Sequence, residues 1–220
     1  MKLVTLAIVL TSFTFSISAQ NQEARIVYDI KMESQDPEIQ AQLAMVGGST
    51  MVTAFKGDKT YQSTSMGSIM ETITITDQSS KKGVMLVNGM MGKFGAMMDL
   101  EEVEENKKDT DIDIELVDET KEIKGYNCKK ALIVDEDGNE TVFWYTDEIV
   151  APKMQSEYFK EQVPGFPLEI YFVTPQMTMS FIATEVEEKV KKAKSLFKIE
   201  IPEGYTEHSF QELQSMVGGV

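Results

Sequence analysis

Residues 128–146 read CKKALIVDEDGNETVFWYT, and this stretch decides the fold class. Two apolar-rich segments flank the residues Asp137 and Gly138, a pair that is typical of a tight turn between antiparallel strands. The stretch therefore predicts a β-hairpin, with strands over Cys128–Asp135 and Glu140–Thr146.

The same alternation of apolar and polar side chains recurs on both sides of this hairpin. In the first such segment Ile26, Tyr28, Ile30 and Met32 alternate with Val27, Asp29, Lys31 and Glu33. Further strands are predicted at Thr50–Lys56, Lys59–Ser65, Ile69–Thr76, Gly83–Val87, Asp111–Leu116, Leu168–Val173 and Met177–Glu187. Helices are expected at Asp36–Met45, Ser156–Gln162 and Ser209–Val217.

This order of elements predicts a mainly β protein of the α+β class. No internal repeat or linker interrupts the pattern, so residues 20–220 are expected to form one domain. A large antiparallel sheet with one apolar face must curl or be covered. We therefore expect a curved antiparallel sheet that forms an incomplete barrel, with the few helices capping its concave face.

The first residues are typical of a secretory signal peptide. Lys2 precedes an apolar run from Leu3 to Leu10, which is too short to span a bilayer comfortably, and Ala19 offers a small residue for cleavage. A buried N-terminal strand is the alternative. No cysteine precedes Cys128, so an N-terminal lipid-modified cysteine is excluded. Residues 1–19 thus predict a cleaved, soluble protein that is periplasmic or secreted.

The net charge excludes some partners. The chain carries 21 Lys and Arg residues against 36 Asp and Glu residues, for a formal charge of −15. Nucleic acid is a poor partner for so acidic a surface, because binding phosphate requires clustered basic side chains. No second apolar run is long enough to cross a bilayer, so stable membrane insertion is not expected.

Cys128 is the single cysteine, so the chain can form no internal disulfide. Its position in a strand with Tyr126, Leu132 and Val134 on the same face predicts a small buried side chain. An intermolecular disulfide or a reactive thiol is the alternative.

No catalytic, metal or cofactor motif stands out. His208 is the only histidine, and neither a nucleophile-elbow motif nor a phosphate-binding glycine loop is present. The acidic residues near Asp137 lack the ligand spacing of a calcium loop, and those from Asp109 to Glu115 fit a solvated strand face. A glycosidase with two carboxylates stays open, although nothing singles out a pair.

Methionine is the unusual feature, with 15 residues. Many fall near a segment from Val87 to Met98 that Gly89, Gly92 and Gly95 interrupt, which predicts a flexible lip over an apolar cavity. The candidate ligand-binding residues are Met85, Met90, Met91, Phe94, Met97 and Met98, together with Met177, Met179 and Phe181 on a late strand. Ordinary core packing and a thioether site for Cu(I) are the alternatives.

One basic run stands out from the acidic background. Its members are Lys189, Lys191, Lys192, Lys194 and Lys198. Such a run is usually a solvated edge that discourages sheet aggregation, and it could instead meet anionic lipid headgroups.

Four segments together resemble a known family. They are Ile123–Ala131, Phe143–Ile149, Pro164–Ile170 and Phe197–Tyr205. Their order and spacing resemble an uncharacterised family of exported bacterial proteins, common in Bacteroidota and catalogued as domain of unknown function 4412. That family is similar in architecture to the lipoprotein carriers LolA and LolB, which implies an incomplete antiparallel barrel closed by helices over an apolar cavity.

The resemblance and the missing chemistry together predict a non-enzymatic envelope protein. Its expected partner is a lipid or another hydrophobic small molecule, with an envelope protein as a further possibility. The alternative is a structural or interaction domain with a filled core, and a hydrolase is the third candidate.

Overall fold

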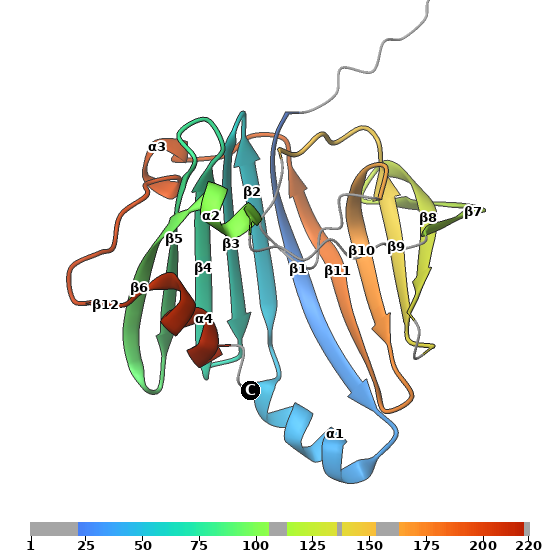
Figure 1. The fold of residues 1–220 in the computed structure, drawn as a ribbon. Coiled ribbons are helices and arrows are strands. Elements are labelled where there is room, and N and C mark those ends of the chain that lie inside the picture. Colours follow the sequence, from blue (N-terminus) through green and yellow to red (C-terminus); the bar gives the residue numbers. More distant parts are fainter. Residues whose placement is uncertain (1–21, 106–113, 136–137, 153–162, 218–220) are drawn as a thin grey trace, which may run out of the picture.

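The computed structural model of the chain describes residues 22–105, 114–135, 138–152 and 163–217, and Figure 1 draws its fold. The strands are β1 (Glu23–Ser34), β2 (Thr50–Lys56), β3 (Lys59–Met66), β4 (Met70–Asp77), β5 (Lys82–Gly89), β6 (Gly92–Asp99), β7 (Ile114–Ile123), β8 (Tyr126–Val134), β9 (Glu140–Thr146), β10 (Phe166–Val173), β11 (Met177–Glu187) and β12 (Thr206–Glu207). The helices are α1 (Pro37–Leu43), α2 (Leu100–Glu105), α3 (Ala193–Leu196) and α4 (Phe210–Val217), with a 3-10 turn η1 (Ala44–Val46) after α1.

All twelve strands belong to one sheet, in the order β12-β6-β5-β4-β3-β2-β1-β11-β10-β9-β8-β7. Strands β1 to β6 form one antiparallel meander and strands β7 to β11 form another. The two meanders meet where β1 pairs with β11, from Arg25 opposite Glu187 to Ser34 opposite Met177. The short strand β12 is the exception, since it runs parallel to β6. The predicted β-rich, mainly antiparallel fold is therefore confirmed.

The sheet is curved and open. The rings of Phe55 on β2 and Phe166 on β10 lie with their centroids 5.5 Å apart. Three strand spacings would separate those strands by roughly 14 Å in a flat sheet, so the sheet must curl toward this side. Among the described strands, the terminal strands β12 and β7 do not pair with each other. We call the side that carries Phe55 and Phe166 the inner face, and the opposite side the outer face.

The inner face of β1, β2 and β8 to β11 is filled by one apolar core. Its largest fully buried side chains include Tyr28, Phe55, Phe143 and Phe181. The Tyr28 hydroxyl donates a 2.8 Å hydrogen bond to the carbonyl oxygen of Pro167, so its one polar group is satisfied. A packed core therefore occupies this part of the curved sheet.

The chain from 190 to 217, which we call the C-terminal strap, crosses the sheet edge at β6. Phe197 packs with Ala54 on the outer face, and β12 then pairs with β6. Beyond the edge, Leu213 of α4 packs on Val87 and Ala96 of the inner face, so the strap contacts both faces of the sheet. Figure 1 shows α3 and α4 at the two ends of this path.

A glycine permits the close approach of the strap to β6. A Cβ atom at Gly95 would lie 2.8 Å from Cγ2 of Ile201 and 3.1 Å from Cδ2 of Leu86. Contacts this short force neighbours to move, so any larger residue would push the strap away from the sheet.

The methionine-rich segment differs from its prediction. Val87–Met98 was expected to be a flexible loop, but it forms the end of β5, a two-residue turn at Met90 and Met91, and most of β6. Gly89 and Gly92 pair with each other across the turn, and Gly92 has a φ of 126°. The glycines therefore shape a hairpin turn rather than a flexible lip.

The remaining helices and strands were predicted only in part. The helix at the end of the chain and the helix after Asp36 are confirmed, whereas α2, α3, β12 and the second half of β7 were missed. The predicted helix Ser156–Gln162 and the signal segment 1–19 lie outside the described residues. The capping of the whole concave face by helices stays a prediction.

Candidate functional site

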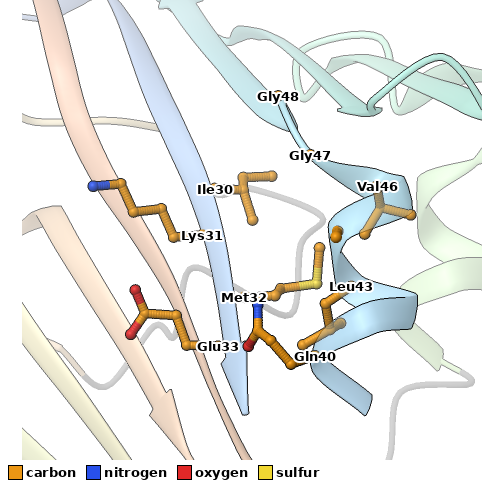
Figure 2. A pocket seen from close by; sticks show the side chains of 10 residues that line it. Ile30, Lys31, Met32, Glu33, Gln40, Leu43, Val46, Gly47 and Gly48 are labelled. Carbon is orange, nitrogen blue, oxygen red and sulfur yellow. The ribbon is translucent and has the colours of Figure 1, made fainter. Parts of the chain in front are cut away.

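A hollow of about 310 Å³ lies between β1 and α1. Its walls are formed by Ile30, Lys31, Met32, Glu33, Gln40, Leu43, Ala44, Val46, Gly47 and Gly48. In Figure 2 the side chains of Ile30 and Met32 point toward α1, whereas Lys31 and Glu33 point to the other side of the strand. The strand period of two thus directs the apolar side chains of β1 toward α1 and the charged side chains of Lys31 and Glu33 away from it.

Local sequence fixes the helix that forms the second wall. The Asp36 side chain accepts hydrogen bonds from the backbone amides of Glu38 (2.8 Å) and Ile39 (3.4 Å), and Pro37 occupies the first helical turn. The Gln40 side chain accepts a 2.8 Å hydrogen bond from the Ser34 backbone amide at the end of β1. None of the α1 residues is buried, so its apolar side chains remain partly exposed beside the strand.

Part of the predicted site lies beside this hollow. Met179 pairs directly with Met32, and Met177 pairs with Ser34, so both methionines share the inner face with the hollow's apolar wall. Both side chains are partly exposed. Phe181 pairs with Ile30 but is only 1% exposed and belongs to the packed core.

The other six predicted residues lie on the β5–β6 hairpin, four strands away from β1. Met85 and Phe94 pack against the strap helix α4, and Met98 is buried. Met97 is 43% exposed on the opposite face of β6, because neighbouring residues in a strand point to opposite sides. The structure therefore does not bring these residues together into one lip.

The two residues at the tip of that hairpin are the most exposed of the predicted ligand-binding residues. Met90 is 87% exposed and Met91 is 77% exposed. They occupy the two central turn positions, so they lie beyond the last paired residues of the sheet.

The hollow's own residues were missed by the sequence analysis. Ile39, Leu43 and Val46 follow one another at helical spacings of four and three, which is the pattern of one apolar helix side. The helix itself was predicted from its capped start at Asp36 and its end at Gly47, but this apolar side was not used to place the helix against a neighbouring strand.

Cys128 is buried, as predicted, with no exposed surface. Burial is the main cause that raises the pKa of its thiol to about 12, and the nearby carboxylate of Glu169 raises it further. Of the predicted companions on its face, Tyr126 packs against the same core, but Leu132 and Val134 were wrong: Ala131 and Ile133 are the buried residues that follow, and Val134 is exposed. The strand thus changes the face that it buries after Cys128.

We expect Cys128→Ser to lower the free energy of unfolding by about 1–3 kcal/mol, because a hydroxyl replaces a thiol in an apolar site. Denaturant unfolding followed by circular dichroism measures this change. A bulky maleimide should label the native wild-type thiol far more slowly than the unfolded one. Equal labelling of native and unfolded protein would contradict burial.

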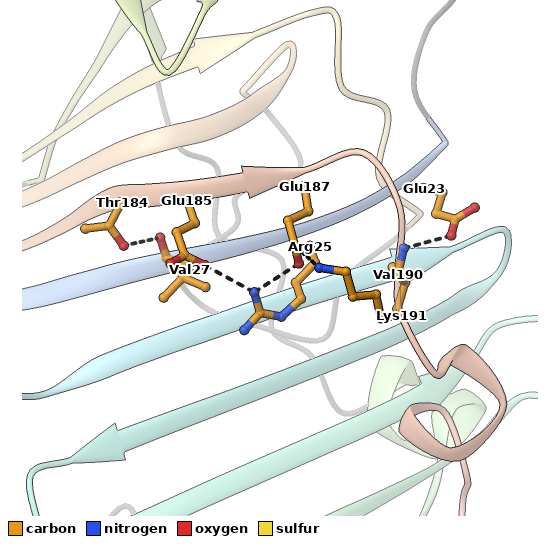
Figure 3. A network of polar contacts seen from close by, with 8 residues as sticks. All are labelled: Glu23, Arg25, Val27, Thr184, Glu185, Glu187, Val190 and Lys191. Atoms are coloured by element: carbon orange, nitrogen blue, oxygen red, sulfur yellow. Dashed lines mark hydrogen bonds and ion pairs between the residues drawn. The ribbon is translucent and has the colours of Figure 1, made fainter.

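Three members of the basic run, Lys189, Lys191 and Lys198, lie in ion pairs with acidic residues, and Figure 3 shows that of Lys191. Lys191 donates to Glu187 at 2.5 Å, and Arg25 of β1 reaches the same carboxylate at 3.3 Å. Lys189 lies 4.0 Å from Glu23. Such exposed pairs contribute at most about 1 kcal/mol each, but they reduce the free positive charge available to an anionic headgroup. This arrangement favours the solvated-edge interpretation.

The described residues do not assemble an evident catalytic or metal centre. His208 lies 3.7 Å from Glu212, and its ring contacts Phe94 with centroids 5.4 Å apart. Hydrogen bonds from the backbone amide and the hydroxyl of Ser209 lower the pKa of Glu212. This carboxylate therefore helps to cap the N-terminus of α4. In the same described ranges, no group of three or more His, Cys, Asp and Glu residues is placed to hold a metal ion.

The family assignment rests on a match over more than half of the chain. The model described as "Domain of unknown function (DUF4412)" matches residues 27–162. The chain belongs to this family. The match spans β1 to β9 of the DUF4412 chain, including both walls of the hollow. No curated protein matches the chain.

Several solved structures are similar to the DUF4412 chain to different degrees. PNGF-II is 16% identical over 90% of this chain with a TM-score of 0.52, and the chain spans 33% of PNGF-II. The Mycobacterium tuberculosis lipoprotein LppX is 6% identical, with a TM-score of 0.39 and coverage of 79% of this chain and 91% of LppX. A LolA superfamily protein from Nitrosomonas europaea is 9% identical, with a TM-score of 0.23 and coverage of 82% and 94%. The PNGF-II match shows a shared fold and nothing about activity.

Across the described ranges, the chain has no helix that is long and apolar enough to cross a membrane.

Proposed function

We propose that this DUF4412 protein is a non-enzymatic cell-envelope protein that binds a small apolar ligand, such as one acyl chain, in the hollow between β1 and α1. The hollow itself carries this proposal, because it joins apolar walls from a strand and a partly exposed helix. The sequence of residues 1–19 supports a periplasmic or secreted location.

The size of the hollow narrows the ligand class. Small-molecule sites usually occupy about 300–1,000 Å³. A volume of about 310 Å³ is at the small end of that range, so it suits one short chain rather than several acyl chains. Met177 and Met179 extend the apolar surface along β11, and their flexible side chains can adapt to a chain that leaves the hollow.

A structural or protein-interaction domain is the second candidate. The observation that favours it is the packed core on the inner face, where Tyr28, Phe143 and Phe181 fill space that a large cavity would need. The two candidates differ in whether the hollow takes up an apolar molecule.

Binding of the environment-sensitive probe dansyl-undecanoic acid tests the proposal. Wild-type protein should enhance the probe's fluorescence saturably, and decanoic acid should compete. We expect Leu43→Asp and Met32→Asp each to weaken probe binding by at least about tenfold, because each places a carboxylate against the apolar chain.

Leu116→Asp is the matched control, since Leu116 is another exposed leucine but lies on β7 away from the hollow. This variant should bind the probe as the wild type does. Native mass spectrometry of gently purified protein should also detect a retained lipid. If the wild-type protein neither retains a lipid nor binds the probe, the structural candidate is the better one.

A further inference from the structure

The inner face of the first meander carries no charge in the described strands. By register, the charged residues of β1 to β6, such as Lys59, Glu71 and Asp77, occupy outer-face positions. In a chain of formal charge −15, this leaves an uncharged surface that continues from the apolar core across β3 and β4 to β6.

Polar but neutral side chains gather in the middle of this surface. Thr64 pairs with Thr72, and Gln62 pairs with Thr53 on one side and Thr74 on the other. We call these five residues the hydroxyl strip. Apolar residues flank it, with the core around Phe55 on one side and the cluster beneath α4 on the other.

At one end of the strip the neighbouring hydroxyl groups are buried and hydrogen-bonded to each other. Thr60 and Thr76 lie next to it on the same face, are buried, and share a 2.6 Å hydrogen bond. Thr53 is also fully buried, yet its hydroxyl has no hydrogen-bond partner. Buried hydroxyls in native proteins almost always have a partner, and the described residues supply none to Thr53.

The four other members of the strip are partly exposed. Among the described residues they have no side-chain hydrogen-bond partner either. Hydroxyl and amide groups both donate and accept hydrogen bonds, so the strip complements a ligand that is rich in hydroxyl groups. A charged ligand would lose hydration here without meeting an opposite charge.

The strip begins close to the hollow. A Cβ atom at Gly67, in the turn between β3 and β4, would lie 3.1 Å from the carbonyl oxygen of Gly47, which lines the hollow. Thr64 and Thr72 are the first hydroxyl pair beyond the Met66–Met70 pair at that end of the strands. An amphipathic molecule could therefore contact both surfaces.

We propose that the hydroxyl strip binds the uncharged, polyhydroxylated sugar of a neutral glycolipid. The inference deepens the proposed function and rests on it, since it assigns the polar part of a ligand whose apolar part enters the hollow. The partly exposed hydroxyl and amide groups of the strip supply the hydrogen bonds to the sugar.

Two sets of probes distinguish the sources of the sugar. Calorimetric titration with decyl β-maltoside below its critical micelle concentration tests the glycolipid, because this molecule joins a neutral disaccharide to one ten-carbon chain. Calorimetric titration with neutral pentasaccharides of glucose, galactose and mannose tests the free sugar. We expect the wild type to bind decyl β-maltoside more tightly than the free pentasaccharides, and the variant Thr64→Val/Thr72→Val/Thr74→Val to lose at least about tenfold in affinity for decyl β-maltoside.

Thr178→Val is the matched control, because Thr178 is a partly exposed threonine on the outer face of β11. It should leave sugar binding unchanged, and neither variant should alter binding of dansyl-undecanoic acid. If the triple variant loses its β-sheet circular dichroism, the single variant Thr74→Val replaces it, with an expected loss of several-fold.

Two results would overturn the inference: no sugar binding by the wild type, or equal binding by the wild type and the strip variants. Probe binding without sugar binding rejects the hydroxyl strip alone. If the wild type binds neither the probe nor the sugar, the proposed function is rejected as well.

Discussion

Replacing Phe181 by alanine is expected to lower the free energy of unfolding by about 3–5 kcal/mol. Phe181 is 1% exposed, and its ring contacts Phe172 with centroids 6.0 Å apart. Removing the ring leaves a cavity in the core where β1, β10 and β11 meet, and the strands around it can relax only in part. Urea unfolding followed by circular dichroism measures the change.

Phe172→Ala serves as the control, because Phe172 lies on the neighbouring strand and is only partly buried. Its loss should be smaller than that of Phe181. If Phe181→Ala costs less than about 1 kcal/mol, the residue faces an open cavity rather than a packed core, and its sequence-based assignment as a ligand contact regains support.

The second large effect is expected for Leu213→Asp. Among the α4 residues whose burial is described, 210–216, Leu213 is the one with no exposed surface, and it packs on Val87 and Ala96. A carboxylate cannot remain in that apolar contact, so α4 should detach while the sheet stays folded. Hydrogen exchange should show loss of protection, by about a hundredfold or more, for the amides of α4 and little change in β1 and β2.

Gln214→Asp is the matched control, since the neighbouring side chain is exposed and the same charge is introduced. It should leave the exchange of α4 close to that of the wild type. Global loss of protection in Leu213→Asp, including β1, would show that the strap is needed for the whole sheet rather than for its edge.

Strand positions were predictable where alternation and turn residues agreed. The hairpin 128–146 and the strands Thr50–Lys56 and Glu140–Thr146 were found because apolar and polar residues alternate between clear turn signals. The residues from Val87 to Met98 misled the prediction because glycine is read as flexibility, although glycines at the two ends of a tight turn can instead supply the backbone angles of a hairpin. Composition alone does not separate these two cases.

The candidate site was less predictable because it depends on contacts between distant residues. Met179 was singled out from the sequence, but its neighbour Met32 is known only once β1 and β11 are paired. Phe181 was assigned to the same surface because it shares a strand face with Met179, yet the curl of the sheet buries it. Burial along one face of a curved sheet therefore changes within two residues.

The pairing of β1 with β11 also has a consequence for the time course of folding. The first described strand becomes a central strand only when it meets a strand near the other end of the chain; Arg25 and Glu187 are separated by 162 positions. Contacts so distant in sequence are slow to form, because a long loop must close before they contribute stability. Each meander can assemble early, whereas their junction must wait until β11 is available. Such late closure suits a chain whose first residues are predicted to direct its export, since it leaves time for passage before the sheet is complete.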